Sequence, residues 1–282
     1  MLAVDINGRS KFMIEVHIDA DDAEVYAKVD FHDKYLRESF IVEALTNALA
    51  LLNESNVKAV VFIVAKNLEK NIPYQDLLQQ FIKDGHAIGN HSYSHAEDFH
   101  RWAKEEQVQD IQLADKVIRE RLGYNPRFFR GPGYSSSHAI QKSLLQMGYV
   151  YDCTKIPLLY SSALDFYFKI NKNGNKSIPS FIRVRDLYFS LAKPIIGIEE
   201  LKIHPNKVWG IPNYSTWMFQ HIDKEQYFSE LIRKTQRPFL FHAVDFLDYS
   251  NNRSKVPALR IQSEDRFQII RKILLQINCR QT

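Results

Sequence analysis

The sequence predicts an α/β fold with a parallel sheet, and a single α/β barrel is the best interpretation. Predicted strands and helices alternate at least four times between residues 11 and 154, a pattern that is typical of parallel βα units. A length of 282 residues is long for an ordinary domain but usual for one such barrel. Polar clusters also follow several predicted strands, which is where these barrels carry their chemistry.

The predicted strands are short runs rich in β-branched and aromatic residues, each followed by a polar break. The run 57–65 carries no charge after Lys58, which is typical of a strand that is buried on both faces of a sheet. On this basis we expect strands at 11–20, 57–65, 86–92, 127–130, 150–154 and 238–244.

Helices are predicted between these strands, where apolar residues recur at helical spacing. Gly85 and Gly123 are stop signals for two of them, and the serines at 135–137 can cap the start of a third. We expect helices at 37–53, 73–84, 104–122, 135–147, 224–234 and 263–277. The stretch around 155–222 shows no regular pattern. We therefore interpret residues 1–282 as one domain with an irregular insertion there, rich in aromatic and basic residues.

Composition and charge limit the classes of protein to consider. Hydrophobic residues make up 45% of the chain and charged residues 25%, as in ordinary globular proteins. The net charge of +4 is too weak to indicate binding of nucleic acid, and no apolar run is long enough to span a bilayer. With two distant cysteines and no secretory signal at the start, we expect a cytoplasmic protein that can contact the cytoplasmic face of the inner membrane peripherally.

An acidic cluster and a histidine pair together predict a metal site. Asp19 and Asp21 share one face of the first strand at period two, whereas Asp22 points elsewhere. His91 and His95 follow the third strand and can converge on one ion if the backbone turns between them. Two neutral imidazoles and one carboxylate form a recurrent catalytic set for zinc. Either aspartate could be the ligand while the other accepts a proton; solvated loop side chains are the alternative.

Two further strand ends carry candidate catalytic groups. Arg130 begins the segment RGPGY, and its guanidinium can hold a buried carboxylate in the ionised form through charge-assisted hydrogen bonds. His242 lies at the end of a late apolar strand, which favours proton transfer over the role of a core histidine. Asp245 could orient His242. His17 is interpreted as a histidine of the barrel interior with a hydrogen-bond partner.

These motifs resemble those of the NodB-homology polysaccharide deacetylases, carbohydrate esterase family 4. That family has an acidic first motif, an H-S/T-x-x-x-H second motif, an R-x-P-x-G/Y third motif and a late L-x-H motif. Here the four read IDADD, HSYSH, RGPGY and LFH, and they begin at residues 18, 91, 130 and 240. The resemblance spans residues 13–245 and implies a single distorted (β/α)7-type barrel.

The resemblance also implies roles for individual residues. Asp19 would be the catalytic base, Arg130 would orient it, and His242 would be the general acid. The ligands of a divalent transition metal, with zinc as the first choice, would be Asp21, His91 and His95. The residues that contact the substrate would be Pro132, Gly133 and Tyr134, the last through a backbone N–H that could hold the oxyanion.

The chain departs from the family pattern at three points. The acidic motif is Asp-x-Asp, Gly131 stands where many members have proline, and no D-x-x-D-W fourth motif is visible. Asp152 stands near the position of that motif, so Asp152 and Asp245 are the two candidates for the residue that tunes His242.

The Asp-x-Asp form and the ending His-Ala-Val-Asp-Phe look more like the branch that acts on undecaprenyl-phosphate-linked amino sugars in lipid A modification. This likeness implies hydrolytic removal of an acetyl or formyl group from a lipid-linked amino sugar. The alternatives are deacetylation of another polysaccharide, a metal-independent amidohydrolase on the same fold, and a non-catalytic carbohydrate- or lipid-binding protein. Basic residues of the insertion, among them Lys155, Lys169, Lys172 and Lys176, are the candidates for contact with a membrane.

Overall fold

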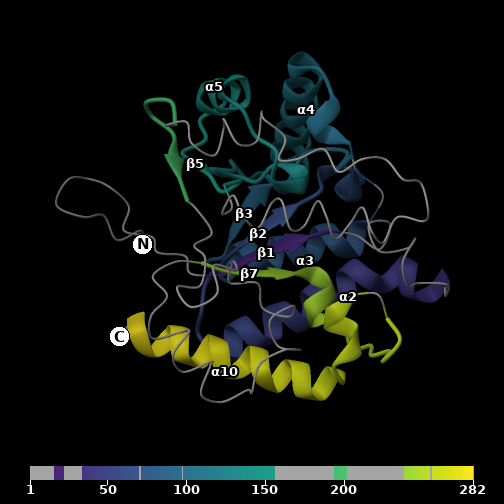
Figure 1. The fold of residues 1–282 in the computed structure, drawn as a ribbon. Helices are drawn as coiled ribbons and strands as arrows, with labels where there is room; N and C mark the ends of the chain where they lie inside the picture. The colour runs from purple at the N-terminus through teal and green to yellow at the C-terminus, as the bar shows by residue number, and fades with distance from the viewer. Residues whose placement is uncertain are drawn as a thin grey trace, which may run out of the picture.

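In a computed structural model of the protein, seven parallel strands form one curled sheet (Figure 1). The structure describes residues 16–21, 34–69, 71–96, 98–155, 194–201, 238–254 and 256–281. The strands are β1 (Val16–Ala20), β2 (Ala59–Ile63), β3 (Ala87–Asn90), β4 (Phe128–Phe129), β5 (Tyr151–Asp152), β6 (Glu199–Glu200) and β7 (Phe239–His242). Their order across the sheet is β6-β5-β4-β3-β2-β1-β7, so chain neighbours are sheet neighbours and β7 returns beside β1. This is the strand order of a (β/α)7-type barrel, which confirms the predicted fold class.

Helices connect the strands and pack on one face of the sheet. The α-helices are α2 (Lys34–Glu54), α3 (Ile72–Lys83), α4 (Lys104–Leu122), α5 (His138–Gln146) and α10 (Ser263–Gln281). Figure 1 shows α4 and α5 beside the β3–β5 half of the sheet, and α2 and α10 beside the half that ends at β7. Short 3₁₀ turns follow several strands: η1 (Ala65–Glu69), η2 (Phe99–Arg101), η3 (Pro132–Tyr134), η4 (Ala243–Phe246) and η5 (Pro257–Arg260).

Local sequence signals set the helix ends. The Asn71 side chain accepts a hydrogen bond from the Tyr74 N–H at 3.0 Å and caps α3. The Ser137 side chain caps α5 in the same way, as the serine run predicted. Gly123 ends α4 with a left-handed backbone (φ 61°), which glycine adopts without strain.

The two faces of the sheet have different environments because successive strand residues point to opposite sides. One face packs under the helices in a large apolar core, to which the strands contribute Val16, Ile18, Ala20, Val61, Ile63, Ile88, Phe239 and Phe241. The other face forms the barrel interior, with a small apolar cluster of Val60, Phe62, Ala87, Phe128 and Cys153. His17 and Asp19 pair in register with Val60 and Phe62, so both residues belong to the interior face.

The predicted elements of the described part are present, with ends that differ by a few residues. One strand was missed: β6 lies inside the stretch that we expected to be irregular throughout. Its residues, Glu199 and Glu200, are charged and lack the β-branched or aromatic character of a strand, so only pairing with β5 reveals it. The predicted helix at 224–234 and most of the insertion lie outside the described residues. Among the helices of the described part, none is both long and apolar enough to cross a membrane.

Candidate metal centre and active site

Residues from three adjacent strands form one row across the barrel interior. Asp19 of β1 pairs in register with Phe62 of β2 on one side and with His242 of β7 on the other. His17 lies two positions earlier on β1 and therefore points to the same side as Asp19. The carboxyl end of the sheet thus carries the polar residues that the sequence placed at strand ends.

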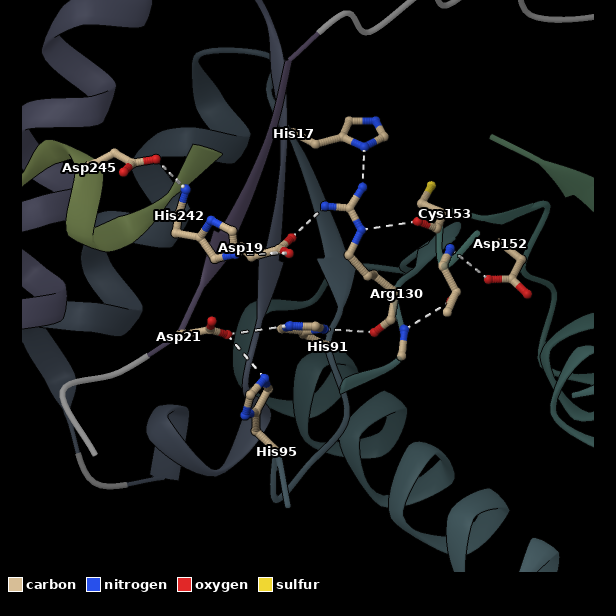
Figure 2. Close-up of polar contacts among 12 residues, drawn as sticks. His17, Asp19, Asp21, His91, His95, Arg130, Asp152, Cys153, His242 and Asp245 are labelled. Atoms are coloured by element: carbon tan, nitrogen blue, oxygen red, sulfur yellow. Dashed lines mark hydrogen bonds and ion pairs between the residues drawn. The ribbon is translucent and has the colours of Figure 1, made fainter. Parts of the chain in front are cut away.

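Asp21, His91 and His95 converge at this end of the sheet (Figure 2). Oδ1 of Asp21 lies 3.4 Å from Nε2 of His91 and 3.2 Å from Nε2 of His95. One ligand atom from each of the three residues lies within 4.8 Å of the other two. Asp21 and His91 are buried, while His95 is partly exposed, so the cluster is open on one side. The structure therefore brings together the three residues that the sequence predicted as metal ligands.

The hydrogen bonds of His91 prepare this cluster for a cation. Nδ1 of His91 lies 2.7 Å from the backbone carbonyl oxygen of Arg130, which can only accept, so Nδ1 carries the proton. Nε2 is then the ring atom that faces Asp21, and its lone pair is available to a cation when the ring is neutral. A metal-bound histidine commonly donates its other ring N–H in this way. Two imidazoles and one carboxylate with an open side fit a divalent late transition metal such as zinc.

Charges within the cluster shift the ionisation of its members. Burial alone raises the pKa of the Asp21 carboxyl, but His95 and His91 outweigh it, and the net pKa lies well below its ordinary value. Burial lowers the pKa of His91, but the hydrogen bond with Asp21 and the negative charges of Asp19 and Asp21 together outweigh it, so its net pKa is raised. A proton and a cation therefore compete for Nε2 of His91.

A carboxylate that sequence reasoning missed fixes the loop between the two histidines. The backbone of this loop is left-handed at Ser92 (φ 69°) and at His95 (φ 49°), which is unfavourable for residues other than glycine. Asp110 of α4 accepts the backbone N–H groups of Tyr93 and Ser94 at 2.8 and 3.2 Å. These bonds stabilise the turn that allows both imidazoles to face Asp21.

Two side chains within the motif itself complete this turn. Oδ1 of Asn90 accepts the Ser92 N–H at 2.8 Å, and the Ser92 hydroxyl accepts the His95 N–H at 3.0 Å. Asn90 in turn donates to the hydroxyl of Tyr149 at 2.9 Å. The loop is therefore held by hydrogen bonds at every step between the two ligands.

Arg130 lies fully buried in the barrel interior, beside the cluster of Asp21, His91 and His95 (Figure 2). It donates from Nη1 to Oδ1 of Asp19 at 2.6 Å and from Nε to the Cys153 carbonyl oxygen at 3.1 Å. Its guanidinium carbon lies 4.3 Å from the centre of the Phe62 ring, a distance at which a cation and an aromatic face attract. Arg130 thus contacts Asp19, the residue that it would orient according to the resemblance of the motifs.

His242 approaches the other oxygen of the same carboxylate. Its Nε2 lies 4.0 Å from Oδ2 of Asp19, and about a quarter of its side chain (24%) is exposed. The predicted partner Asp245 accepts the backbone N–H of His242 at 2.9 Å. This bond fixes the backbone at His242. Arg266, which is fully buried, donates from Nε to the Asp245 carbonyl oxygen at 2.8 Å and holds the turn η4 against α10.

The turn after β4 explains the glycine that departs from the family pattern. The N–H of Gly131 donates to the Thr154 hydroxyl at 3.0 Å, and a Cβ at this position would lie 1.8 Å from the Ser135 carbonyl oxygen. Proline has no N–H and has a Cβ, so it would lose the bond and clash. The next residues, Pro132, Gly133 and Tyr134, form η3. The Tyr134 N–H donates to the Gly131 carbonyl oxygen at 3.0 Å, so this proposed oxyanion donor is already engaged.

Asp152 supports the turn after β4. Its carboxylate accepts from the Ser136 hydroxyl at 2.9 Å, from the Gln141 amide at 3.1 Å and from the Thr154 N–H at 3.0 Å. Burial raises the pKa of this carboxyl. These bonds connect Asp152 to the residues after RGPGY and to Thr154, whose hydroxyl accepts the Gly131 N–H. The sequence had suggested Asp152 as a partner of His242 instead.

Lys155 corrects another expectation. We counted it among the basic residues that could meet a membrane, but it is buried and its Nζ lies 2.8 Å from a carboxylate oxygen of Glu200 in β6. The remaining basic residues of that hypothesis, including Lys169, Lys172 and Lys176, lie outside the described residues, as does Asp22.

Comparison with known proteins agrees with the resemblance of the motifs. Residues 21–151 match the sequence profile of a family described as polysaccharide deacetylase. A peptidoglycan-N-acetylglucosamine deacetylase of Bacillus cereus is 31% identical over 91 residues, which are 32% of this chain and 32% of that protein. A peptidoglycan deacetylase of Helicobacter pylori is 23% identical over 197 residues, 69% of this chain and 63% of that protein. Over the matched residues, the chain is therefore similar to polysaccharide deacetylases.

The overall fold also agrees with a solved structure. A family 4 carbohydrate esterase from Streptomyces lividans, solved in complex with acetate, superimposes with a TM-score of 0.50 at 11% sequence identity. The superposition covers 96% of this chain and 90% of that structure. The chain spans only 27% to 32% of the length of three of its curated relatives.

Proposed function

We propose that this protein is a metal-dependent hydrolase that removes an N-acyl group from an amino sugar. The observation that carries the proposal is the position of the Asp19 carboxylate. It lies 2.6 Å from the Arg130 guanidinium and 4.0 Å from the His242 imidazole, at the same end of the sheet as three side chains that could hold a metal ion. Homology to peptidoglycan and chitin deacetylases supports the same reaction class.

Asp21, His91 and His95 would hold the cation. A divalent cation bound there would polarise the amide carbonyl and lower the pKa of water. Oδ1 of Asp19 is engaged by Arg130, so Oδ2 is the oxygen that accepts the proton of the attacking water. The hydrogen bond from Arg130 keeps the carboxylate in one orientation while it does so.

His242 is placed to complete the reaction. The amide nitrogen is a poor leaving group until it is protonated, and the partly exposed imidazole of His242 faces the same carboxylate. When the water oxygen has bonded to the acyl carbon, a proton from His242 goes to the nitrogen and the C–N bond breaks. The products are the free amino sugar and acetate or formate.

For the substrate we propose an N-acyl amino sugar linked to a polyprenyl phosphate, used at the cytoplasmic face of the inner membrane in lipid A or envelope glycan modification. The support is the Asp-x-Asp spacing of the acidic motif and the ending His-Ala-Val-Asp-Phe, which look like that branch of the family. The curated relatives act on peptidoglycan or chitin by their names, so a polymer of N-acetylglucosamine is the competing substrate.

The test is to incubate the purified, metal-loaded protein with four substrates and to measure the free amine that is released. The substrates are undecaprenyl-phosphate-linked N-formyl and N-acetyl amino sugars, a chitin oligomer and a peptidoglycan fragment. We expect release from at least one, abolished by a chelator and restored by a divalent metal. Asp19→Asn and His242→Ala should each lose about 10²–10⁴-fold in rate. Absence of release from all four would contradict the function; release only from the polymers would contradict the lipid-linked substrate.

A further inference from the structure

His17 is a buried histidine that neither the metal cluster nor the proposed chemistry uses. It has no exposed surface, and its Nδ1 lies 2.5 Å from Nη2 of Arg130 (Figure 2). Its ring meets the Phe62 ring edge-on, with 5.3 Å between the centres and 70° between the planes. A histidine that only filled the interior would need no such short contact with a catalytic-site arginine.

The contact determines the state of the His17 ring. A guanidinium can only donate hydrogen bonds, so Nδ1 of His17 must accept. The proton of the neutral ring is then on Nε2. Burial, together with the charge of Arg130, holds the pKa of His17 well below its ordinary value, in agreement with a neutral imidazole.

The guanidinium of Arg130 is therefore fixed on three sides. Nη1 donates to Asp19, Nη2 donates to His17 and Nε donates to the Cys153 carbonyl oxygen. Below its plane lies the Phe62 ring. If the acceptor at His17 were absent, a fully buried donor would lack its bond, and the guanidinium could turn to find another acceptor.

Gly89 makes room for this arrangement. A Cβ at Gly89 would lie 2.5 Å from Cδ1 of Phe62, so only glycine allows the ring to rest over β3. The ring in that position contacts both the Arg130 guanidinium and the edge of His17. Phe62 and Gly89 are register partners on β2 and β3, in the same row as Asp19.

A neutral acceptor has an advantage over a carboxylate at this position. A second carboxylate would compete with Asp19 for the positive charge of Arg130 and would draw the guanidinium toward itself. A neutral imidazole satisfies Nη2 and leaves the charge of Arg130 to Asp19. We propose that His17 is a positioning residue for the deacylation reaction: as a neutral hydrogen-bond acceptor, it fixes the Arg130 guanidinium and, through it, the carboxylate of Asp19.

This inference rests on the proposed function, and a set of three variants tests it. In His17→Asn the amide oxygen stands at the same bond distance from Cβ as Nδ1, so it preserves the acceptor. In His17→Gln the oxygen lies one carbon farther, and His17→Leu fills the volume without an acceptor. Small displacements of catalytic groups cost on the order of 10²-fold in rate, so we expect kcat to fall about 10–100-fold in His17→Leu. KM should change less than about two-fold, because Arg130 and Asp19 act on the reaction rather than on binding.

The decisive comparison is between the variants that differ only in the position of the acceptor. His17→Asn should recover most of the kcat that His17→Leu loses, while His17→Gln should not. Metal content should equal that of the wild type in all three, since His17 contacts none of the three ligands in the described contacts. Wild-type kcat in His17→Leu, or equal losses in His17→Asn and His17→Leu, would overturn the proposal. If His17→Leu does not fold, the comparison of His17→Asn with His17→Gln decides.

A measurement without substrate separates this inference from the proposed function. In ¹H–¹⁵N spectra, the guanidinium protons of Arg130 should be protected from exchange in the wild type and in His17→Asn, and should exchange faster in His17→Leu. Unchanged protection in His17→Leu would contradict the role of His17 whether or not any substrate is hydrolysed. Protection as expected, with no amine released from any substrate, would contradict the function and leave the contact intact.

Discussion

The guanidinium of Arg130 lies 2.6 Å from the carboxylate of Asp19, although 111 positions separate the two residues in the chain. Both side chains are buried, with 0% and 3% of their surface exposed. A buried charge without a partner is strongly destabilising, so each residue needs the other in the folded protein. The pair links β1 to the segment after β4 across the barrel interior. It connects the stability of the fold to the geometry of the proposed base.

Arg130→Lys is the first test of this pair. Lysine keeps the charge, but all of its N–H donors are on one nitrogen atom. It therefore cannot donate to Asp19, His17 and the Cys153 carbonyl oxygen at once. We expect the free energy of unfolding to fall by about 1–3 kcal/mol, the cost of leaving a buried acceptor without its hydrogen bond, and kcat to fall at least about 10²-fold. Urea denaturation and amine release measure the two effects. A variant with wild-type stability and rate would show that the three separate donor nitrogens of Arg130 are not needed.

His91→Ala tests the metal centre. The variant should lose the metal and the hydrolytic activity while it keeps a cooperative unfolding transition, because His91 lies at a strand end rather than in the apolar core. Metal content by elemental analysis and unfolding by circular dichroism are the measurements. Full metal occupancy in His91→Ala would contradict the assignment of the ligands.

Asp110→Ala tests the support of the histidine loop. The substitution removes both acceptors of the Tyr93 and Ser94 N–H groups, and the left-handed backbone at Ser92 and His95 loses its support. Loss of a group that orients metal ligands typically costs 10–100-fold in affinity, and we expect about 10-fold weaker binding of zinc by calorimetry. Glu105→Ala, an exposed position on the same helix, is the control and should bind as the wild type. Equal affinities in the two variants would exclude a role for Asp110.

Gly131→Ala tests the turn that carries Arg130. A Cβ there would lie 1.8 Å from the Ser135 carbonyl oxygen, so the backbone must shift, and we expect a loss of about 1–3 kcal/mol in stability. Gly133→Asn is the matched control, since no atom lies within 4 Å of a Cβ at Gly133 and asparagine tolerates its left-handed backbone (φ 55°). Thermal unfolding compares the two. A larger loss in Gly133→Asn than in Gly131→Ala would contradict the explanation.

His86 makes the stability of the fold depend on pH. Its Nδ1 accepts the Ala59 N–H at 3.2 Å, and burial lowers its pKa from the ordinary value of 6.5 to about 4. Between these values the unfolded chain binds more protons at this group than the folded chain does. Its contribution to stability is complete above pH 6.5 and is lost as the pH falls toward 4, by about 3 kcal/mol.

The variant His86→Asn isolates this effect. Its amide oxygen can still accept the Ala59 N–H but does not titrate. We expect the drop in urea midpoint between pH 7 and pH 4.5 to be smaller in the variant than in the wild type. An equal drop in both proteins would assign the acid sensitivity to other groups.

The sequence by itself predicted the fold class and the group of side chains that meets at one end of the sheet. Alternating strands and helices indicated a parallel sheet, and the carboxyl ends of parallel strands meet at one edge. Asp21 follows β1 and the two histidines, His91 and His95, follow β3, so their meeting at that edge could be predicted without coordinates. The same reasoning placed Arg130 and His242 beside Asp19, because each of them also stands at a strand end.

Only the tertiary structure decided which partners the other polar residues have. No sequence pattern singled out Asp110, because a carboxylate on a charged helix is normally solvated. In the structure, it accepts two backbone N–H groups of the loop between His91 and His95. The sequence around Lys155 favoured contact with a membrane, but in the folded protein Lys155 is buried and forms an ion pair with Glu200. His17 was expected to have a partner, but its sequence context did not say that the partner is Arg130. Periodicity fixes the face on which a side chain lies, whereas its partner depends on which remote residues the folded chain brings within hydrogen-bond distance of it.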